Sequence, residues 1–146
     1  MTVSRVGHDD RAFHGAKLAV FVGRRLATLL RDDKPNIPWP GYWDLPGGGR
    51  EGTETGVQCA VRETHEELGL IIPLDAPHWG RMYWRKGLPF WFLAVNLPAS
   101  AEADIRLGDE GQGWKLMDPM EYMIHPKAIP PFQSRLADYL AGLPSE

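Results

Sequence analysis

Residues 48–70 read GGREGTETGVQCAVRETHEELGL, and this stretch carries the clearest structural and chemical signals of the chain. Thr55 and Gln58 have the S/T-x-x-E/Q spacing of a capping box, which predicts a helix that begins just after Thr55. Gly69 stands where a glycine commonly ends a helix in the left-handed conformation. The pattern therefore predicts one helix between Thr55 and Gly69.

The apolar and acidic side chains of this helix fall on different faces. At about 100° per residue, one face collects small and apolar side chains, namely Val57, Ala60, Val61, Thr64 and Leu68. Glu63, Glu66 and Glu67 lie within about 100° of each other on the opposite face. Like charges at this spacing cost about 0.2–0.5 kcal/mol per pair on a helix surface. The pattern therefore indicates either a bound cation or an acidic face exposed to water.

Two neighbouring features favour a hard cation. Carboxylate oxygens are the ligands that Mg²⁺ and Mn²⁺ take, and Arg62 can fix the orientation of an adjacent carboxylate. Residues 45–49 read LPGGG, and glycines let the backbone approach a metal or a phosphate closely. The loop is not a phosphate-binding P-loop, because no Gly-Lys-Ser/Thr follows it.

Upstream of the helix, the pattern predicts strands and a long loop. The apolar run 16–23 predicts a strand that turns near Gly23, and residues 24–32 predict a second hairpin strand or a short helix. Residues 33–54 are rich in proline and glycine and predict a long functional loop, with a brief strand at 43–45. The polar residues 1–13 predict a loose arm or an edge strand.

Downstream of the helix, alternation and helical periodicity predict further elements. Strands are expected at 78–85, 89–97 and 113–117, the first two joined by a turn at Lys86–Gly87. A short helix is expected to start at Pro119, and a final helix over 132–143 with Phe132, Leu136, Tyr139 and Leu140 inward. This order predicts an α+β or mixed α/β sandwich, in a single domain over residues 1–146.

The composition excludes several classes of protein. The chain has 146 residues, of which 43% are hydrophobic and 24% charged, and a net charge of −3. This charge and the lack of a basic run argue against nonspecific nucleic-acid binding. The apolar runs are too short to span a membrane, and the N-terminal residues lack the apolar region of a signal peptide. The lone Cys59 excludes an intramolecular disulfide, which favours the cytoplasm.

The spacing across the loop and helix resembles a known family. From Gly48, five residues lead to Glu54 and seven more to Arg62. The stretch matches G-x5-E-x7-R-E-U-x-E-E-x-G-U, the Nudix box, at every fixed position; only Thr64 stands where an aliphatic residue is usual. The Thr64 hydroxyl is expected to bond to the Ala60 carbonyl. The resemblance implies the Nudix α/β/α sandwich, an α/β fold with a mixed β-sheet.

The resemblance also implies a role for each residue of the box. The implied ligands of Mg²⁺ or Mn²⁺ are the Gly48 carbonyl, Glu63, Glu66 and Glu67; Arg62 would orient Glu63, and Glu54 would support the loop–helix junction.

A further glutamate often comes from outside the box in this family. Residues 108–114 read GDEGQGW, and Glu110 resembles a catalytic or metal-binding glutamate of MutT-type enzymes. Asp109 and Glu102 are its rivals, and a solvated polar turn without function is the alternative. Either Glu63 or Glu110 would act as the general base.

The implied activity is metal-dependent hydrolysis of a pyrophosphate linkage in a nucleoside diphosphate joined to another group. The short chain and the Glu110 loop favour a nucleoside or deoxynucleoside triphosphate, cut to a monophosphate and pyrophosphate. The alternatives are a nucleotide sugar such as ADP-ribose, or a nonhydrolytic module that senses a nucleotide. The expected partner is a small nucleotide, not a nucleic acid or a membrane, and the oligomeric state stays open.

Aromatic side chains near the predicted site allow two interpretations. Alternation places Trp79, Arg81, Tyr83 and Arg85 on one face of a strand, where they would stack a base and hold phosphates. Packing in the core is the commoner use of aromatic side chains in strands. The sequence alone therefore assigns no base-binding residue.

Overall fold

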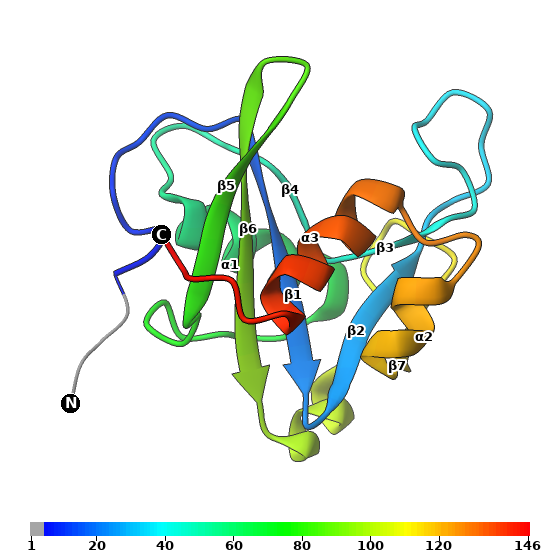
Figure 1. Cartoon of the computed structure of the whole chain (residues 1–146). Coiled ribbons are helices and arrows are strands. Elements are labelled where there is room, and N and C mark those ends of the chain that lie inside the picture. The colour runs from blue at the N-terminus through cyan, green and yellow to red at the C-terminus, as the bar shows by residue number, and fades with distance from the viewer. Residues whose placement is uncertain (1–4) are drawn as a thin grey trace.

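The computed structural model describes residues 5–146. Helices flank a mixed seven-stranded sheet, with α1 behind the sheet and α3 in front of it (Figure 1). The strands are β1 (Gly15–Val22), β2 (Arg25–Leu30), β3 (Trp43–Asp44), β4 (Gly47–Gly49), β5 (Trp79–Arg85), β6 (Leu88–Leu97) and β7 (Gly113–Met117). The helices are α1 (Gly56–Leu68), α2 (Pro119–Ile124), α3 (Pro130–Leu140) and the 3-10 helix η1 (Ala99–Asp104).

The strand β1 is the centre of the sheet. The main order is β3-β2-β1-β6-β5, and β4 pairs with β1 while β7 pairs with β2. Among the strand pairs of residues 5–146, β1 and β6 are the parallel one, in a register from Gly15 opposite Phe90 to Val22 opposite Leu97, and the others are antiparallel. A central strand with helices over both faces must be apolar on both sides, which explains the continuous apolar run of β1.

Successive β1 side chains enter two separate cores. Leu18, Val20 and Val22 pack in the core that includes the buried face of α1. Ala19 and Phe21 pack in the other, which includes Tyr122 of α2 and Leu136 of α3. This two-period alternation builds the three layers, and the predicted sandwich with a mixed sheet is confirmed.

The predicted ends of α1 are confirmed. The Thr55 hydroxyl accepts from the Gln58 N–H at 3.2 Å, and the Gln58 side chain accepts from the Thr55 N–H at 2.9 Å. Gly69 ends the helix with a φ of 72°, which is strained for residues with a Cβ. On the inward face, the Thr64 hydroxyl donates to the Ala60 carbonyl at 2.7 Å, as expected.

Most of the remaining elements agree with the sequence pattern. The hairpin turns at Gly23, and residues 25–30 form its second strand rather than a helix. The β5–β6 turn lies at Lys86–Gly87, β7 spans 113–117, and α2 starts at Pro119 with Asp118 as its N-cap. Within residues 5–146, no helix is long and apolar enough to cross a membrane.

Some details differ from the sequence predictions, whereas the N-terminal arm agrees with one of its two alternatives. Residues 5–13 form no strand, which fits the loose arm, and residues 1–4 lie outside the described part. The short strand β4 and the helix η1 were not predicted. The final helix begins at Pro130, and Leu140 was wrongly placed inward, because its side chain is 46% exposed. Leu140 is the last residue of α3.

The capping box gives a direct test of how α1 begins. Replacing Thr55 by Ala removes the acceptor for the Gln58 N–H, so we expect the free energy of unfolding to fall by about 1 kcal/mol. Urea unfolding measures this, and Thr53→Ala is the control, since Thr53 is exposed. Equal stability of the two variants would contradict the capping role.

Candidate metal centre

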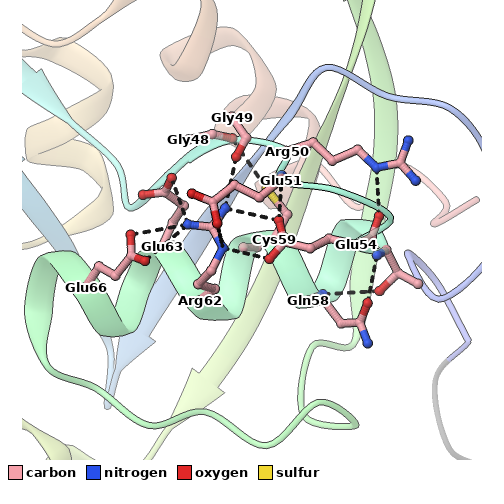
Figure 2. Close-up of polar contacts among 12 residues, drawn as sticks. Gly48, Gly49, Arg50, Glu51, Glu54, Gln58, Cys59, Arg62, Glu63 and Glu66 are labelled. Carbon is pink, nitrogen blue, oxygen red and sulfur yellow. Dashed lines mark hydrogen bonds and ion pairs between the residues drawn. The ribbon is translucent and has the colours of Figure 1, made fainter.

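The guanidinium of Arg62 joins the glycine loop to the acidic face of α1 (Figure 2). Its Nε and Nη2 donate to the two carboxylate oxygens of Glu54 at 2.6 and 3.0 Å, and Nη2 also donates to the Gly49 carbonyl at 3.0 Å. Its Nη1 lies 3.3 Å from Glu63 Oε1 and 3.2 Å from Glu66 Oε2. One cation therefore offsets part of the repulsion among these carboxylates.

The Arg62–Glu54 pair is the best shielded of these contacts. The two side chains are 21% and 17% exposed, and the bidentate geometry is the strong form of an Arg–carboxylate contact. The hydrogen bond from Arg62 lowers the pKa of Glu54, while the Glu54 carboxylate raises the pKa of Arg62. Glu54 also accepts from the Glu51 N–H at 2.8 Å. It lies at the loop–helix junction, where the sequence resemblance placed it.

Glu63 packs directly against the glycine loop. A Cβ built on Gly48 would lie 2.5 Å from Glu63 Oε1, so any larger residue there would displace the carboxylate from its present position. Burial raises the pKa of Glu63, and the charge of Glu66 adds to this, while Arg62 lowers it. The Gly48 carbonyl, predicted as a metal ligand, lies 3.5 Å from the Cys59 Sγ.

Glu67 is held at the other end of the loop. Its Oε1 accepts from the Gly47 N–H at 2.8 Å. Burial raises its pKa to about 7, with smaller contributions from the charges of Asp44 and Glu63, while Lys17 and the Gly47 N–H act in the opposite direction. Without a bound cation, this carboxyl is therefore only partly ionised near neutral pH. A positive charge bound nearby would favour its ionised form.

Lys17 is a residue near the site that sequence reasoning missed. Its Nζ donates to Asp44 Oδ1 at 3.1 Å, to the Leu45 carbonyl at 3.1 Å and to the Gly47 carbonyl at 3.0 Å. These contacts fix the glycine loop from the side of β1. The available signal was a lone cation within the apolar run 16–23.

The loop that carries Glu110 is anchored at the C-terminal end of α1. The Gly108 N–H donates to the Glu67 carbonyl at 2.9 Å, and a Cβ on Gly108 would lie 2.1 Å from the Glu66 carbonyl oxygen. Farther along, the Gln112 N–H donates to the Leu30 carbonyl at 2.8 Å. These anchors bring the predicted further glutamate beside the box, because only residues 109–111 lie between them.

The acidic side chains of the two segments meet at one cavity. Its volume is about 330 Å³, and its lining consists of Glu63, Glu66, Glu67, Asp109 and Glu110. The rival Glu102 lies elsewhere, on η1, where it pairs with Arg25 at 2.6 Å. The structure therefore leaves Glu110 and Asp109 as candidates for the further acid and removes Glu102 from the site.

The donor set fits a hard divalent cation, although the side chains do not yet surround one. All five cavity-lining side chains supply carboxylate oxygens, and no basic residue lines the cavity in the described part of the chain. Among residues 5–146, however, no three His, Cys, Asp or Glu side chains come close enough together to hold a metal ion. Arg62 holds Glu63 and Glu66, and the Gly47 N–H holds Glu67, so binding would require these side chains to turn.

Two other candidate features take structural roles. Cys59 is buried, and burial raises its pKa to about 12, so it is a protonated thiol at neutral pH, as expected for an inert side chain. Trp79 and Tyr83 pack edge-on against Phe92, in the core beneath α3. The packing interpretation of these aromatic side chains is therefore the right one.

Comparisons with known proteins agree with this geometry. A family model described as NUDIX domain matches residues 14–140. An RNA pyrophosphohydrolase of Erythrobacter litoralis is 32% identical over 156 residues, covering 91% of each chain. Nudix hydrolase 3 of Arabidopsis thaliana is 37% identical over 75 residues; the match spans 51% of this chain but only 10% of that protein.

Solved structures share the fold at low sequence identity. A MutT protein of Methanosarcina mazei has a TM-score of 0.67 and 15% identity, and the match covers 91% of this chain and 96% of that one. A bifunctional NMN adenylyltransferase/ADP ribose pyrophosphatase of Francisella tularensis, complexed with AMP and a Mn ion, has a TM-score of 0.71 and 17% identity; the match covers 91% and 42%. The MutT-type resemblance of the box is confirmed.

An exposed ion pair with the same 2.6 Å distance tests whether burial makes the Arg62–Glu54 pair matter more for stability. Arg62→Met leaves Glu54 without its cation, so we expect the free energy of unfolding to fall by roughly 2–3 kcal/mol. Arg25→Met removes the partner of Glu102 in a pair whose side chains are 48% and 46% exposed, and should cost less than about 1 kcal/mol. Equal losses in urea unfolding would contradict the proposed difference.

The raised pKa of Glu67 predicts how the metal-free protein responds to pH. The folded state binds more protons than the unfolded state between pH 4.5, the unfolded value, and about pH 7. With a chelator present, the free energy of unfolding should fall by about 1 kcal/mol between pH 6 and pH 8 through this group. Glu67→Gln should remove that part of the slope and raise stability at pH 8. An unchanged slope in the variant would show that Glu67 is not responsible.

Proposed function

The chain belongs to the NUDIX domain family of hydrolases, and from this premise we propose that it cleaves a nucleoside or deoxynucleoside triphosphate into a monophosphate and pyrophosphate. The proposed enzyme is a single cytoplasmic domain over residues 1–146 and requires Mg²⁺ or Mn²⁺. Its target bond is a phosphoric anhydride, the linkage on which the family acts.

The observation that carries this proposal is the acidic cavity. Three carboxylates of α1 and two of a distant loop line one space of about 330 Å³ beside a glycine loop. Such a concentration of carboxylates, with Glu67 already raised in pKa, is costly unless a cation binds there. A solvated acidic face, the plainer interpretation, would not need a half-buried Glu67 or a second acidic segment clamped opposite it.

Each residue of the candidate site has a distinct proposed role. Glu63, Glu66, Glu67 and the Gly48 carbonyl would hold the divalent ion, with Glu110 from the opposite loop. When bound, such an ion neutralises phosphate charge, polarises the phosphorus and lowers the pKa of a bound water. Without a metal, Arg62 donates to Glu63 and Glu66, and its bidentate contact with Glu54 joins the end of the glycine loop to α1.

The general base is one of two glutamates. Glu63 is mostly shielded, and its pKa is raised by burial, which moves a carboxylate toward the range useful for a base. Glu110 faces the same cavity from the loop and is free of the contacts to Arg62 that restrain Glu63. Either side chain would take the proton of the attacking water, and the geometry does not select one over the other.

One relative supports a rival substrate, and the family resemblance leaves a second. The Erythrobacter relative is an RNA pyrophosphohydrolase and aligns with 91% of this chain, which favours a triphosphate carried on RNA as a second candidate. A nucleotide sugar such as ADP-ribose is the second rival substrate. The Francisella structure belongs to an ADP ribose pyrophosphatase, but at 17% identity it supports the fold alone. A nonhydrolytic sensing module is a third possibility, and it would bind nucleotide without turnover.

A phosphate-release screen tests the proposal. Nucleoside triphosphates, oxidised guanine nucleotides, dinucleotides, ADP-ribose and 5′-triphosphate RNA are incubated with Mg²⁺ or Mn²⁺ and a coupled pyrophosphatase, or with a coupled phosphatase where the product is a monophosphate. We expect pyrophosphate release from a triphosphate, and none with a chelator or with Glu67→Gln. Turnover of ADP-ribose or RNA alone would overturn the substrate, and no turnover despite metal-dependent binding would favour the sensing module.

The same assay separates the candidate acids. Removing the general base should lower kcat by about 10²–10⁴-fold, whether Glu63→Gln or Glu110→Gln is responsible. Asp109→Asn is the matched control for Glu110→Gln, because both side chains line the cavity from the same loop. A larger loss with Asp109→Asn than with Glu110→Gln would assign the further acid to Asp109.

A further inference from the structure

A second cavity lies between the sheet and α3 and shares the glycine loop with the metal centre. Its volume is about 250 Å³, and its lining includes Gly48, Lys17, Phe90, Phe132, Arg85 and Arg135. Gly48 also touches Glu63 of the acidic cavity. A ligand that occupies this cavity would therefore lie beside the backbone that borders the metal centre.

Arg135 is the unusual residue of this cavity. Its side chain belongs to α3 and the residue is only 8% exposed, yet in residues 5–146 its guanidinium forms no ion pair and no hydrogen bond. It stacks instead over the rings of Tyr83 and Phe132, at 5.0 and 5.7 Å from the ring centroids. Its nitrogens are not fully buried, since His8 Nε2 is the one fully buried unpaired side-chain nitrogen or oxygen in residues 5–146, but partial burial of a guanidinium without a partner still carries a cost.

The charges around Arg135 increase this cost. Burial lowers the pKa of Arg135; Tyr83 acts in the opposite direction, and the nearby positive charge of Arg85 lowers the pKa further. No acidic side chain lines the cavity in the described residues. Lys17 cannot serve a ligand there as it stands, because its three donors are directed to Asp44 and the backbone of the glycine loop. The side-chain donors left for a ligand belong to the two arginines and to His14, which lines the cavity at its β1 end.

The shape and chemistry of the cavity select a flat, acceptor-bearing ligand. The guanidinium has five donors and no acceptor, so its partner must present acceptors. Phe90 and Phe132 supply ring surfaces, which favour a planar aromatic group over a phosphate that would lose its hydration against them. Among nucleobases, a 6-oxopurine presents two adjacent acceptors, O6 and N7, that match the guanidinium, whereas adenine presents the N6 amino donor instead of O6.

We propose that this cavity receives the base of the nucleotide and that Arg135 selects a 6-oxopurine by donating to its O6 and N7. This inference rests on the proposed function, because it takes the ligand to be a nucleotide whose phosphates extend past Gly48 toward the acidic cavity. Arg135 is then a specificity-determining residue rather than a catalytic one.

Binding without metal and without hydrolysis tests the assignment. Tryptophan fluorescence titrations with a chelator present would compare GMP, AMP and inorganic phosphate. The wild-type chain should bind GMP more tightly than AMP by roughly 5- to 150-fold, the range that one bidentate arginine–guanine contact supplies. Arg135→Met, which keeps much of the apolar stem, and Arg135→Lys, which keeps the charge without the planar fork, should each reduce this ratio to near one.

A matched control separates base recognition from a general loss of charge or folding. Arg81→Met removes an arginine of β5 whose guanidinium donates to the Pro144 carbonyl and does not line this cavity, so its GMP:AMP ratio should equal that of the wild type. Melting temperatures show whether each variant is folded. If Arg135→Met does not fold, the lysine variant still decides the result.

Specific outcomes overturn the inference. Equal wild-type affinity for GMP and AMP would remove the selective role of Arg135, as would a preference that survives in both variants. Competition by inorganic phosphate, equal for both bases and lost in the variants, would make Arg135 a phosphate contact. Because no turnover is measured, an inactive protein that still selects GMP through Arg135 would refute the hydrolase alone, and an active one without this selection would refute only this inference.

Discussion

The contact between Arg62 and Glu54 is the constraint on which the candidate site depends. It spans the end of the glycine loop and the second turn of α1, and the same guanidinium reaches Glu63 and Glu66. Three carboxylates therefore surround one cation before any ligand is present. The helix face needs such an internal counterion, because three carboxylates at this spacing repel one another. A bound cation would offset the repulsion that remains among these carboxylates.

The glycine loop also lies between two cavities: the acidic cavity, and the cavity lined by Phe90 and Phe132, called the aromatic cavity below. Side chains on Gly47 or Gly48 would collide with β1 or with Glu63, so the loop lies flat between the strand and the helix. Lys17 holds the loop from one side, and Glu67 holds it from the other. The acidic cavity and the aromatic cavity are thus separated by little more than a stretch of backbone, which is the arrangement a ligand with a flat end and a charged end requires.

Local signals in the sequence were enough for α1 and the acidic box, because capping, helical period and spacing act within a few residues. Contacts between residues that are far apart in the sequence could not be predicted from such local signals. Three glycines carry no tendency to form a strand, and β4 exists because β1 pairs with it. Lys17 and Arg135 acquire their importance from distant partners, the glycine loop and the ring of Tyr83. Glu110 could be named only through family resemblance, and its place beside the box follows from the hydrogen bonds of Gly108.

The number of residues in the anchored loop 108–112 matters for the candidate site, because both ends of the loop are hydrogen-bonded to other elements. Gly108 is tied to the end of the helix and Gln112 to the end of β2, so Asp109, Glu110 and Gly111 form a tether of three residues. A tether this short permits small adjustments of an acidic side chain but not a change of register. In evolution, this segment would accept exchanges of one acid for another more readily than insertions or deletions. The neighbouring η1 segment, with no buried residue, is where length variation would be absorbed.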